Sequence, residues 1–555
     1  MLSSGQRCRE VKKMQTVISP EIFPKANEIP DNAQLNGPVQ GRLLIGGELL
    51  DSGFERRSVV SPIFTRSEKG TLEDTILGST PQATATHMQN AVQAAADAWR
   101  SGTGQWPSAR MEERLIAVAE FVRRMQLHRE TIVRLLMWEI CKTRADAEAE
   151  FDRTIVYIND TLEAAKSLDR DSSRLQFAQG YVALVRRMPL GVTLCMGPFN
   201  YPLNETFTTL IPALVMGNTT VVKVPRYGQL LWDCLLPEFQ ACFPAGVVNV
   251  VNGQGREIIG AAMRNGDIDV LAFIGSSRVA NTLKAQHPRP NRLRSILGLD
   301  AKNPAILLDD APFELSLKET IKGALSFNGQ RCTALKLVCV PESISAAWCE
   351  ELANRVNQLK VGLPWQTGVQ ITPLPDTAKP QELKNMVDEA VADGAHLYHP
   401  QTALRGHATL IHPAVVGGVK WTHTMAQIEQ FGPLIPVLTY KNLDDVIEQI
   451  VDSPFGMQAS IFGSEPRRLG ALIDALSNQV ARINLNTACQ RGPDIFPFTG
   501  RKNSAEGTLS VHDALRAFSL RTMVAGMGAQ TESREAIRGI LEHDTSKFLT
   551  NHVIL

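Results

Sequence analysis

One cysteine of this 555-residue chain stands in a setting that favours nucleophilic chemistry. Cys332 lies within SFNGQRCTALK (326–336), where a glycine and polar residues precede it and Arg331 is adjacent. A neighbouring cation can lower the pKa of a thiol, and a loop can keep its sulfur accessible. Cysteine is also a common small core residue, so the local sequence leaves two roles open for Cys332, a nucleophile and a packing residue.

Two short turns are candidate binding sites for phosphate groups. The turn at 253–255 reads Gly-Gln-Gly but has Ile258 where a GxGxxG motif requires its third glycine, so it is a weak signal. The turn at 275–277, Gly-Ser-Ser, ends an apolar run and opens a helical pattern, so its amides and hydroxyls can receive phosphate oxygens. The alternative is that Ser276 is an ordinary helix N-cap.

The elements that must position these groups form an alternating series. Residues 113–140 and 153–168 have helical apolar spacing, and from residue 181 onward strands and helices alternate. The strands are predicted at 181–191, 192–202 (ending in a loop), 219–225, 246–253, 269–275, 302–308, 336–341, 434–440 and 459–463. Strands separated by helices predict an α/β fold with two parallel-sheet lobes and a ligand site between them.

Composition excludes several classes of protein. The 57 basic and 57 acidic residues cancel, which argues against nucleic-acid or membrane binding through bulk charge. The sequence contains no apolar run long enough for a transmembrane helix, and no CxxC or HExxH pattern that would predict a metal site. The nine scattered cysteines and a basic start without an apolar segment indicate reduced thiols and no secretory signal, so we expect a cytoplasmic location.

Six motifs, in this order along the chain, resemble those of the NAD(P)-dependent aldehyde dehydrogenases. They span most of residues 40–530 and read PLGVTLCMGPFNYPLN (189–204), ALVMGNTTVVKVP (213–225), FIGSS (273–277), GQRCTALK (329–336), EQFGPLIPV (429–437) and PFTGRKNS (497–504).

The resemblance implies an enzyme in which Cys332 attacks the aldehyde carbon. The resulting thiohemiacetal would lose hydride to nicotinamide and become a thioester. Asn200 matches the side-chain amide that stabilises the oxyanion together with the backbone N–H of Cys332. The resemblance also implies four cofactor contacts: Lys223 and Glu429 to ribose hydroxyls, Phe431 beside the nicotinamide, and Ser276 to the pyrophosphate.

Within the family, the sequence most resembles the non-phosphorylating, NADP-dependent glyceraldehyde-3-phosphate dehydrogenases, chiefly through NTACQRGPDIFPFTGRK (486–502). That branch holds the substrate phosphate with arginines and a tyrosine, and the matching residues are Arg153, Tyr201, Arg331 and Arg491. Guanidinium groups suit a phosphate dianion, so we expect a basic active cleft. The expected reaction is oxidation of glyceraldehyde 3-phosphate to 3-phosphoglycerate.

Arg226 bears on the choice of cofactor. Many NAD-preferring relatives have glutamate three residues after the lysine that matches Lys223, where its carboxylate accepts from a ribose hydroxyl. An arginine there would pair with the 2′-phosphate of NADP instead. We therefore expect NADP, with NAD possible.

Gly298 departs from the family pattern. The usual Glu-Leu-Gly-Gly-Lys string, whose glutamate activates water for thioester hydrolysis, reads Gly-Leu-Asp-Ala-Lys at 298–302. Glycine cannot act as a base. Three interpretations remain open: Asp300 could serve from a shifted loop, the thioester could be passed to coenzyme A, or turnover could be slow or absent, which would leave a binding or structural protein. The alternative activity is that of an aldehyde or semialdehyde dehydrogenase with another substrate, which could depend on coenzyme A.

We divide the chain into an irregular arm (1–40), a cofactor lobe (41–298) with an oligomerisation strand near 178–190, a catalytic lobe (299–503), an oligomerisation segment (504–530) and a C-terminal extension (531–555). The resemblance implies a homodimer or homotetramer.

Overall fold

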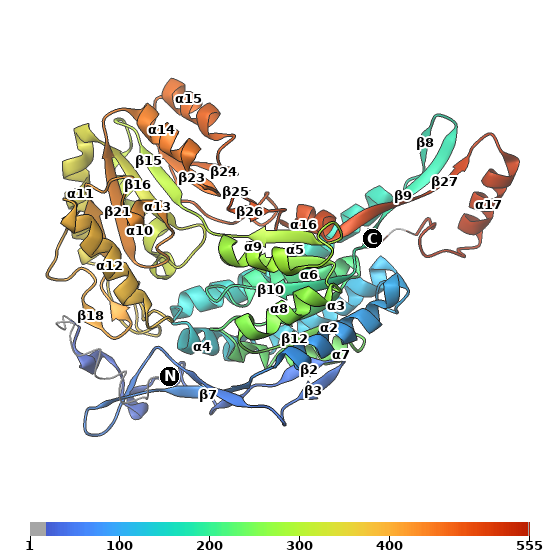
Figure 1. Ribbon diagram of the computed structural model, residues 1–555, viewed down its shortest axis with the longest axis horizontal. Helices are drawn as coiled ribbons and strands as arrows, with labels where there is room; N and C mark the ends of the chain where they lie inside the picture. The colour runs from blue at the N-terminus through green and yellow to red at the C-terminus, as the bar shows by residue number, and fades with distance from the viewer. Residues whose placement is uncertain (1–17, 553, 555) are drawn as a thin grey trace.

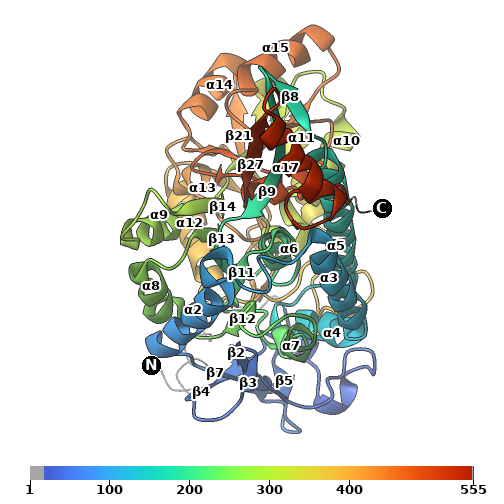
Figure 2. The same ribbon diagram turned by 90° about the vertical axis from the view of Figure 1, so that its right-hand side faces the viewer.

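The computed structural model describes residues 18–552 and 554; the first 17 residues of the predicted N-terminal arm, and residues 553 and 555 of the extension, lie outside them. Two α/β lobes stand side by side, and a narrow arm projects from one of them (Figures 1 and 2). This confirms the predicted fold class. Within the described part of the chain, no helix is both long and apolar enough to cross a membrane.

The first lobe is built on an eight-stranded sheet, parallel in its central five strands. In spatial order its strands are β26 (Ala505–Glu506), β14 (Arg294–Gly298), β13 (Val270–Ile274), β10 (Val192–Met196), β11 (Thr219–Lys223), β12 (Val248–Val251), β2 (Leu43–Ile45) and β3 (Glu48–Leu50). The three outer strands β26, β2 and β3 pair antiparallel.

Helices cover both faces of this sheet because its central strands are apolar on both sides. Along β11, Val221 packs against the helices α2 (Ala85–Trp99), α8 (Gly255–Asn265) and α9 (Ser277–Gln286). The next residue, Val222, faces the opposite core, which contains α3 (Met111–Gln126), α4 (Arg129–Glu139), α5 (Arg144–Ser172), α6 (Asn204–Met216) and α7 (Leu236–Cys242). Such continuous apolar strands are typical of parallel sheets buried between helices. The helical pattern of 113–140 is divided into α3 and α4 by a break at Leu127–His128.

The second lobe has a seven-stranded sheet with the same construction. Its strands are β17 (His396–Leu397), β20 (Ala414–Gly417), β21 (Leu434–Tyr440), β16 (Leu335–Pro341), β15 (Asn303–Leu307), β23 (Gln458–Phe462) and β24 (Arg482–Leu485), all parallel except β17. The helices packed on it are α10 (Phe313–Leu325), α11 (Glu342–Asn357), α12 (Lys379–Ala392), α14 (Leu443–Asp452) and α15 (Pro466–Leu476).

The arm contains β8 (Gln176–Ala178), β9 (Tyr181–Pro189) and β27 (Ser519–Met527). β27 and β9 pair antiparallel at nine positions, and α17 (Thr531–Glu542) packs on β27. The chain then returns to the body, where Asp544 pairs with Arg110 at 2.6 Å. The described part of the N-terminal segment, residues 18–40, contains two short 3-10 turns and the strand β1 (Val39–Gln40).

Candidate active site between the lobes

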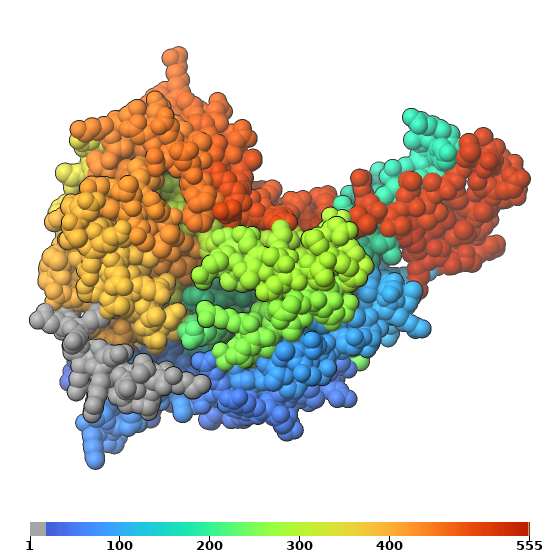
Figure 3. Space-filling view, in the orientation of Figure 1, coloured from blue at the N-terminus to red at the C-terminus, as the bar shows by residue number. Residues whose placement is uncertain are grey.

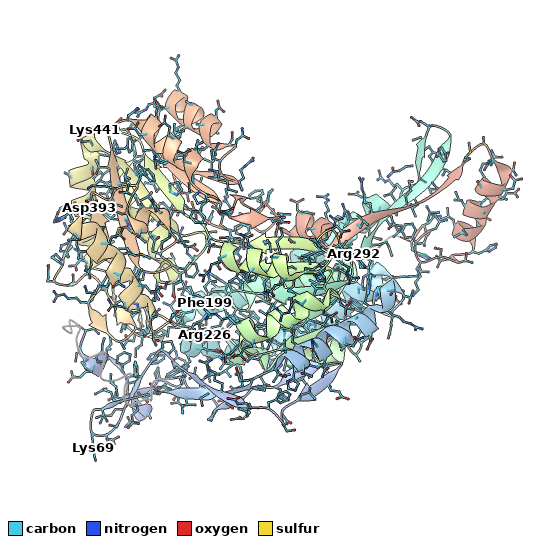
Figure 4. All side chains as sticks on the ribbon, viewed as in Figure 1. Lys69, Phe199, Arg226, Arg292, Asp393 and Lys441 are labelled. Carbon is cyan, nitrogen blue, oxygen red and sulfur yellow. The ribbon has the colours of Figure 1, made fainter. Side chains whose placement is uncertain are left out.

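A cavity of about 790 Å³ lies where the two lobes meet. Figure 3 shows a recess there between the yellow and orange second lobe and the green helices of the first, and Figure 4 labels Phe199 and Arg226 at this junction. Every site residue predicted above lines this one cavity: Cys332, Asn200, Lys223, Arg226, Ser276, Glu429, Phe431, Arg153, Tyr201, Arg331 and Arg491.

The topology explains why these distant residues meet. The first lobe contributes loops that follow the carboxyl ends of its parallel strands: Asn200 after β10, Arg226 after β11 and Ser276 after β13. Such ends form the usual ligand crevice of a parallel sheet. The second lobe contributes the segments that precede β16 and β21, which hold Cys332 and Glu429.

A tightly bonded turn presents Cys332. Phe327, Asn328 and Gly329 all have positive φ angles, of 49°, 56° and 70°. A side chain at Gly329 would lie 2.6 Å from two backbone oxygens, so only glycine fits there. The Asn328 side chain stabilises the unusual backbone by donating to Thr372 O at 3.1 Å and accepting from Thr372 N at 2.9 Å.

Two further side chains, which the sequence reading did not single out, hold the cysteine backbone. Asn303 Nδ2 donates to Cys332 O at 2.7 Å and to Ala334 O at 3.0 Å. Lys336 Nζ lies 3.3 Å from Cys332 O and 2.6 Å from the Glu429 carboxylate. Lys336 stands four residues after Cys332 in the quoted motif, so its position was visible in the sequence but its partner was not.

The local expectation that Arg331 lowers the pKa of the Cys332 thiol is wrong. Burial raises that pKa to about 11, with a further rise from the Glu205 carboxylate and a partial offset from Lys336. The adjacent Arg331 donates from Nη2 to the backbone oxygen of Gly323 at 2.8 Å. The thiol is held in the neutral form in this arrangement.

Asn200 lies in the loop between β10 and α6, on the same cavity wall as the thiol. Its Nδ2 donates to Gln330 O at 2.7 Å, two residues before Cys332. Because an amide nitrogen carries two N–H donors, this bond orients the group and leaves the second donor for another acceptor. The geometry is compatible with the predicted role toward an oxyanion.

The first lobe contributes three of the predicted cofactor residues, Lys223, Arg226 and Ser276, to the cavity. Burial lowers the pKa of Lys223, at the end of β11, to about 8. The Arg226 guanidinium lies 5.0 Å from the Tyr227 ring, and neither cation forms an ion pair with a described residue. Ser276 caps α9, where its Oγ accepts from Val279 N at 3.4 Å. The donor set of two unpaired cations beside a helix N-terminus fits a phosphate-bearing dinucleotide.

Two acidic side chains that line the cavity are already bonded to neighbouring residues. Asp300 accepts hydrogen bonds of 2.7 Å from both N and Oγ of Ser277, so a carboxylate already occupies the first turn of α9. Glu429 is engaged by Lys336, and burial raises its pKa despite this pairing. The turn at 253–255 does not line the cavity; Gly253 is required because a side chain there would lie 2.9 Å from Ala83 O.

The arginines predicted to hold a substrate phosphate are close together but not free. Arg153 makes two bonds to Asp494, of 3.0 and 2.8 Å, and Arg491 pairs with both Glu205 and Asp494. Arg331 differs, because its Nε is buried without a partner among the described residues.

Tyr201 packs under the ammonium group of Lys142, 3.3 Å from the ring centre, and burial raises the pKa of its hydroxyl. The expected basic character of the cleft is small, because four acidic side chains line the cavity beside five basic ones.

Comparisons with known proteins identify the family. A profile described as the aldehyde dehydrogenase family matches residues 68–524. An NADP-dependent glyceraldehyde-3-phosphate dehydrogenase of Streptococcus equinus is 32% identical over 396 residues, which are 70% of this chain and 81% of that protein. A malonate-semialdehyde dehydrogenase of Bacillus thuringiensis is 25% identical over 86% of this chain and 96% of its own length.

The solved structures include an NADP-dependent glyceraldehyde-3-phosphate dehydrogenase of Bacillus halodurans C-125 complexed with NADP. It is 30% identical, has a TM-score of 0.79, and the match covers 89% of this chain and all of that one. The resemblance inferred from the motifs is confirmed, and the nicotinamide cofactor is supported by these relatives. The chain belongs to the aldehyde dehydrogenase family and is an NAD(P)-dependent aldehyde oxidoreductase.

Proposed function

We propose that this protein oxidises glyceraldehyde 3-phosphate to 3-phosphoglycerate with NADP. The observation that carries the proposal is the meeting of Cys332, Asn200 and the four candidate phosphate ligands in one cavity. Among those ligands, Arg331 has an unpartnered Nε, which is a donor available to a phosphate oxygen. The names of relatives such as the Streptococcus equinus enzyme support the same substrate.

In this proposal the chain first generates a nucleophile. The Cys332 thiol loses its proton to water, and its sulfur forms a bond to the aldehyde carbon as the carbonyl π electrons move onto oxygen. The second N–H of Asn200 and the backbone N–H of Cys332 stabilise that oxyanion. Lys336 and Asn303 hold the loop so that these donors converge.

NADP, when bound, accepts the hydride that leaves the substrate carbon and so leaves a thioester on Cys332. Lys223 and Ser276 would contact the ribose and the pyrophosphate, Phe431 would pack near the nicotinamide, and Arg226 would pair with the 2′-phosphate. Glu429 would have to share its carboxylate between the ribose and Lys336.

A second outcome, supported by Gly298, is that the thioester is passed to coenzyme A or turns over slowly. Gly298 lines the cavity but brings no base to it. Three of the four carboxylates that line the cavity are already bonded to side chains: Asp300 to Ser277, Glu429 to Lys336 and Glu205 to Arg491. Hydrolysis of the thioester by water is therefore the step of the proposed cycle that the cavity residues support least.

The experiment is a rapid-mixing assay of the purified full-length protein, which follows reduced cofactor with glyceraldehyde 3-phosphate, unphosphorylated glyceraldehyde and short semialdehydes. We expect preference for the phosphorylated substrate and for NADP, with 3-phosphoglycerate as product. A burst of one reduced cofactor per site that coenzyme A converts to steady turnover would favour the acylating alternative. Equal kcat/KM for phosphorylated and unphosphorylated glyceraldehyde would refute the substrate assignment, and Cys332→Ala is the inactive control.

We also propose a cytoplasmic homodimer or homotetramer that is assembled through the arm. Supporting this, Phe177, Leu520 and Met523 of the arm sheet are large apolar side chains exposed by 77%, 55% and 62%. β27 is also an edge strand of that sheet, with one side unpaired. Analytical ultracentrifugation of the protein and of a Met523→Glu variant tests the assembly, and an unchanged monomer would refute it.

A further inference from the structure

Four charged side chains close a network at the substrate end of the cavity. Arg153 donates twice to Asp494, Arg491 Nε donates to Asp494 at 3.2 Å, and Arg491 Nη1 pairs with Glu205. Arg153, Glu205 and Arg491 line the cavity directly. The side chains of Glu205, Arg491 and Asp494 are each less than 10% exposed, so water screens these contacts little.

Each nitrogen of the Arg491 guanidinium has a hydrogen-bond partner. Its Nε donates to Asp494, its Nη1 to Glu205 and its Nη2 to Leu509 O at 3.3 Å, while Phe498 packs 4.5 Å from the guanidinium carbon. The neighbouring carboxylates raise the pKa of Arg491, and the two arginines keep the pKa of Asp494 low despite its burial. Two cations and two anions cancel, so a phosphate that approaches Arg491 competes with carboxylates that are already paired with it, although Nη1 and Nη2 each carry a second N–H.

The two carboxylates are not equally replaceable. Asp494 is held by both arginines, with three hydrogen bonds in total. The Glu205 carboxylate pairs with Arg491 and has no second partner among the described residues. Glu205 also stands in the first turn of α6, beside the loop that holds Asn200, and it has the largest electrostatic influence on the Cys332 thiol. It therefore occupies the substrate end of the cavity, close to the reacting sulfur.

We infer that Glu205 is an internal competitor for the phosphate subsite: it occupies Arg491 and sets the discrimination between phosphorylated and unphosphorylated aldehydes. The inference rests on the proposed function, because it concerns the same cavity. A dianionic substrate competes with the Glu205 carboxylate for Arg491, whereas an uncharged aldehyde does not. Glu205 is thus a specificity-determining residue that weakens phosphate binding.

The test is Glu205→Gln, which removes the charge and keeps the size. We expect KM for glyceraldehyde 3-phosphate to fall about tenfold or more, because the competing charge-assisted bond is lost. We expect KM for unphosphorylated glyceraldehyde to change less than about twofold. The matched control is Glu238→Gln, which removes a carboxylate paired with Arg124 and His128 outside the cavity and should alter neither KM.

Inorganic phosphate supplies a readout that does not depend on turnover. In phosphate-free buffer, calorimetric titration of the folded variant should show phosphate binding about tenfold or more tighter than in the wild type. If neither protein oxidises glyceraldehyde 3-phosphate but the variant binds phosphate more tightly, the proposed function fails and the inference holds.

If Glu205→Gln leaves phosphate binding unchanged or weakens it, Glu205 only orients Arg491 and the inference is overturned. Thermal unfolding checks that the variant is folded; should it unfold, Glu205→Met, of similar length and without charge, repeats the test.

Discussion

Restoring a carboxylate at Gly298 tests whether the missing base limits this enzyme. A Cβ added to Gly298 would lie 3.4 Å from Leu509 Cδ1 and 3.5 and 3.7 Å from the two Cγ atoms of Ile274. These are ordinary van der Waals distances, and Gly298 is not among the positive-φ residues. Its position at the end of β14, on the cavity wall, gives the new side chain access to the thioester region.

The expected effect on the turnover rate is large because a general base accelerates proton transfer strongly. A positioned base contributes about 10²–10⁴-fold to a proton-transfer step, which is about 3–5 kcal/mol of barrier at about 1.4 kcal/mol per tenfold change. If hydrolysis limits turnover, Gly298→Glu should raise the steady-state rate by at least about 10²-fold. Two of the contacts are to Ile274, so the carboxylate is partly desolvated, and we expect a moderately lower melting temperature.

The assay is rapid mixing with glyceraldehyde 3-phosphate and NADP, which separates the first turnover from the steady state. The wild type should show a burst followed by slow turnover, and Gly298→Glu should lose the burst because hydrolysis becomes fast. Gly298→Gln is the matched control, since it has the same length without a base, and it should retain the burst. If Glu and Gln variants behave alike, or if the wild type already turns over without a burst, deacylation does not need a base at this position.

Three further perturbations bear on the same site. Asn200→Ala should lower kcat by about 10²–10³-fold through loss of an oxyanion donor. It should also lower the melting temperature, because Gln330 O loses its buried donor; a loss of kcat below threefold would contradict the role of this amide. Arg226→Gln should reduce kcat/KM for NADP by roughly tenfold or more, since a hydrogen bond to a charged group contributes about 1.5–3 kcal/mol. The same variant should leave kcat/KM for NAD nearly unchanged. An unaltered ratio of the NADP and NAD values would count against the 2′-phosphate contact. Burial raises the pKa of Cys332 to about 11, so its thiolate fraction in the cofactor-free protein increases with pH. The rate at which iodoacetamide alkylates Cys332, followed by mass spectrometry of its peptide, should therefore rise about tenfold per pH unit between about pH 6 and 9. A plateau below pH 8 would mean that the pKa is low instead.

Much of the fold and the membership of the site could be read from local sequence. The strands of both lobes are runs such as TTVVK at 219–223, buried on both faces, and their apolar character alone distinguishes a parallel sheet between helices. Motifs at strand ends then identify the cavity residues, because the carboxyl ends of parallel strands share one edge. Asn200, Ser276 and Cys332 are found together for this reason.

The ion pairs and hydrogen bonds of those residues were decided by long-range contacts, which no local sequence pattern contains. Arg491 and Glu205 are separated by 286 positions, and Arg153 and Asp494 by 341. Spacing along the chain carries no signal for either pair, so the cleft was predicted to be basic without the four acidic side chains that line it beside five basic ones. Lys336 and Glu429 were both inside quoted motifs, yet their 2.6 Å contact depends on how two separate strands are placed.

The thiol shows the same division most simply. The sequence by itself determined that Cys332 lies in a glycine-bearing loop beside Arg331, and hence that it is the candidate nucleophile. Only the tertiary structure decided its ionisation, because burial and the Glu205 carboxylate raise the pKa of the sulfur. Neighbours along the chain constrain the backbone of a residue. The charge state of its side chain depends instead on how far the whole fold excludes water from it and which charged groups the fold places near it.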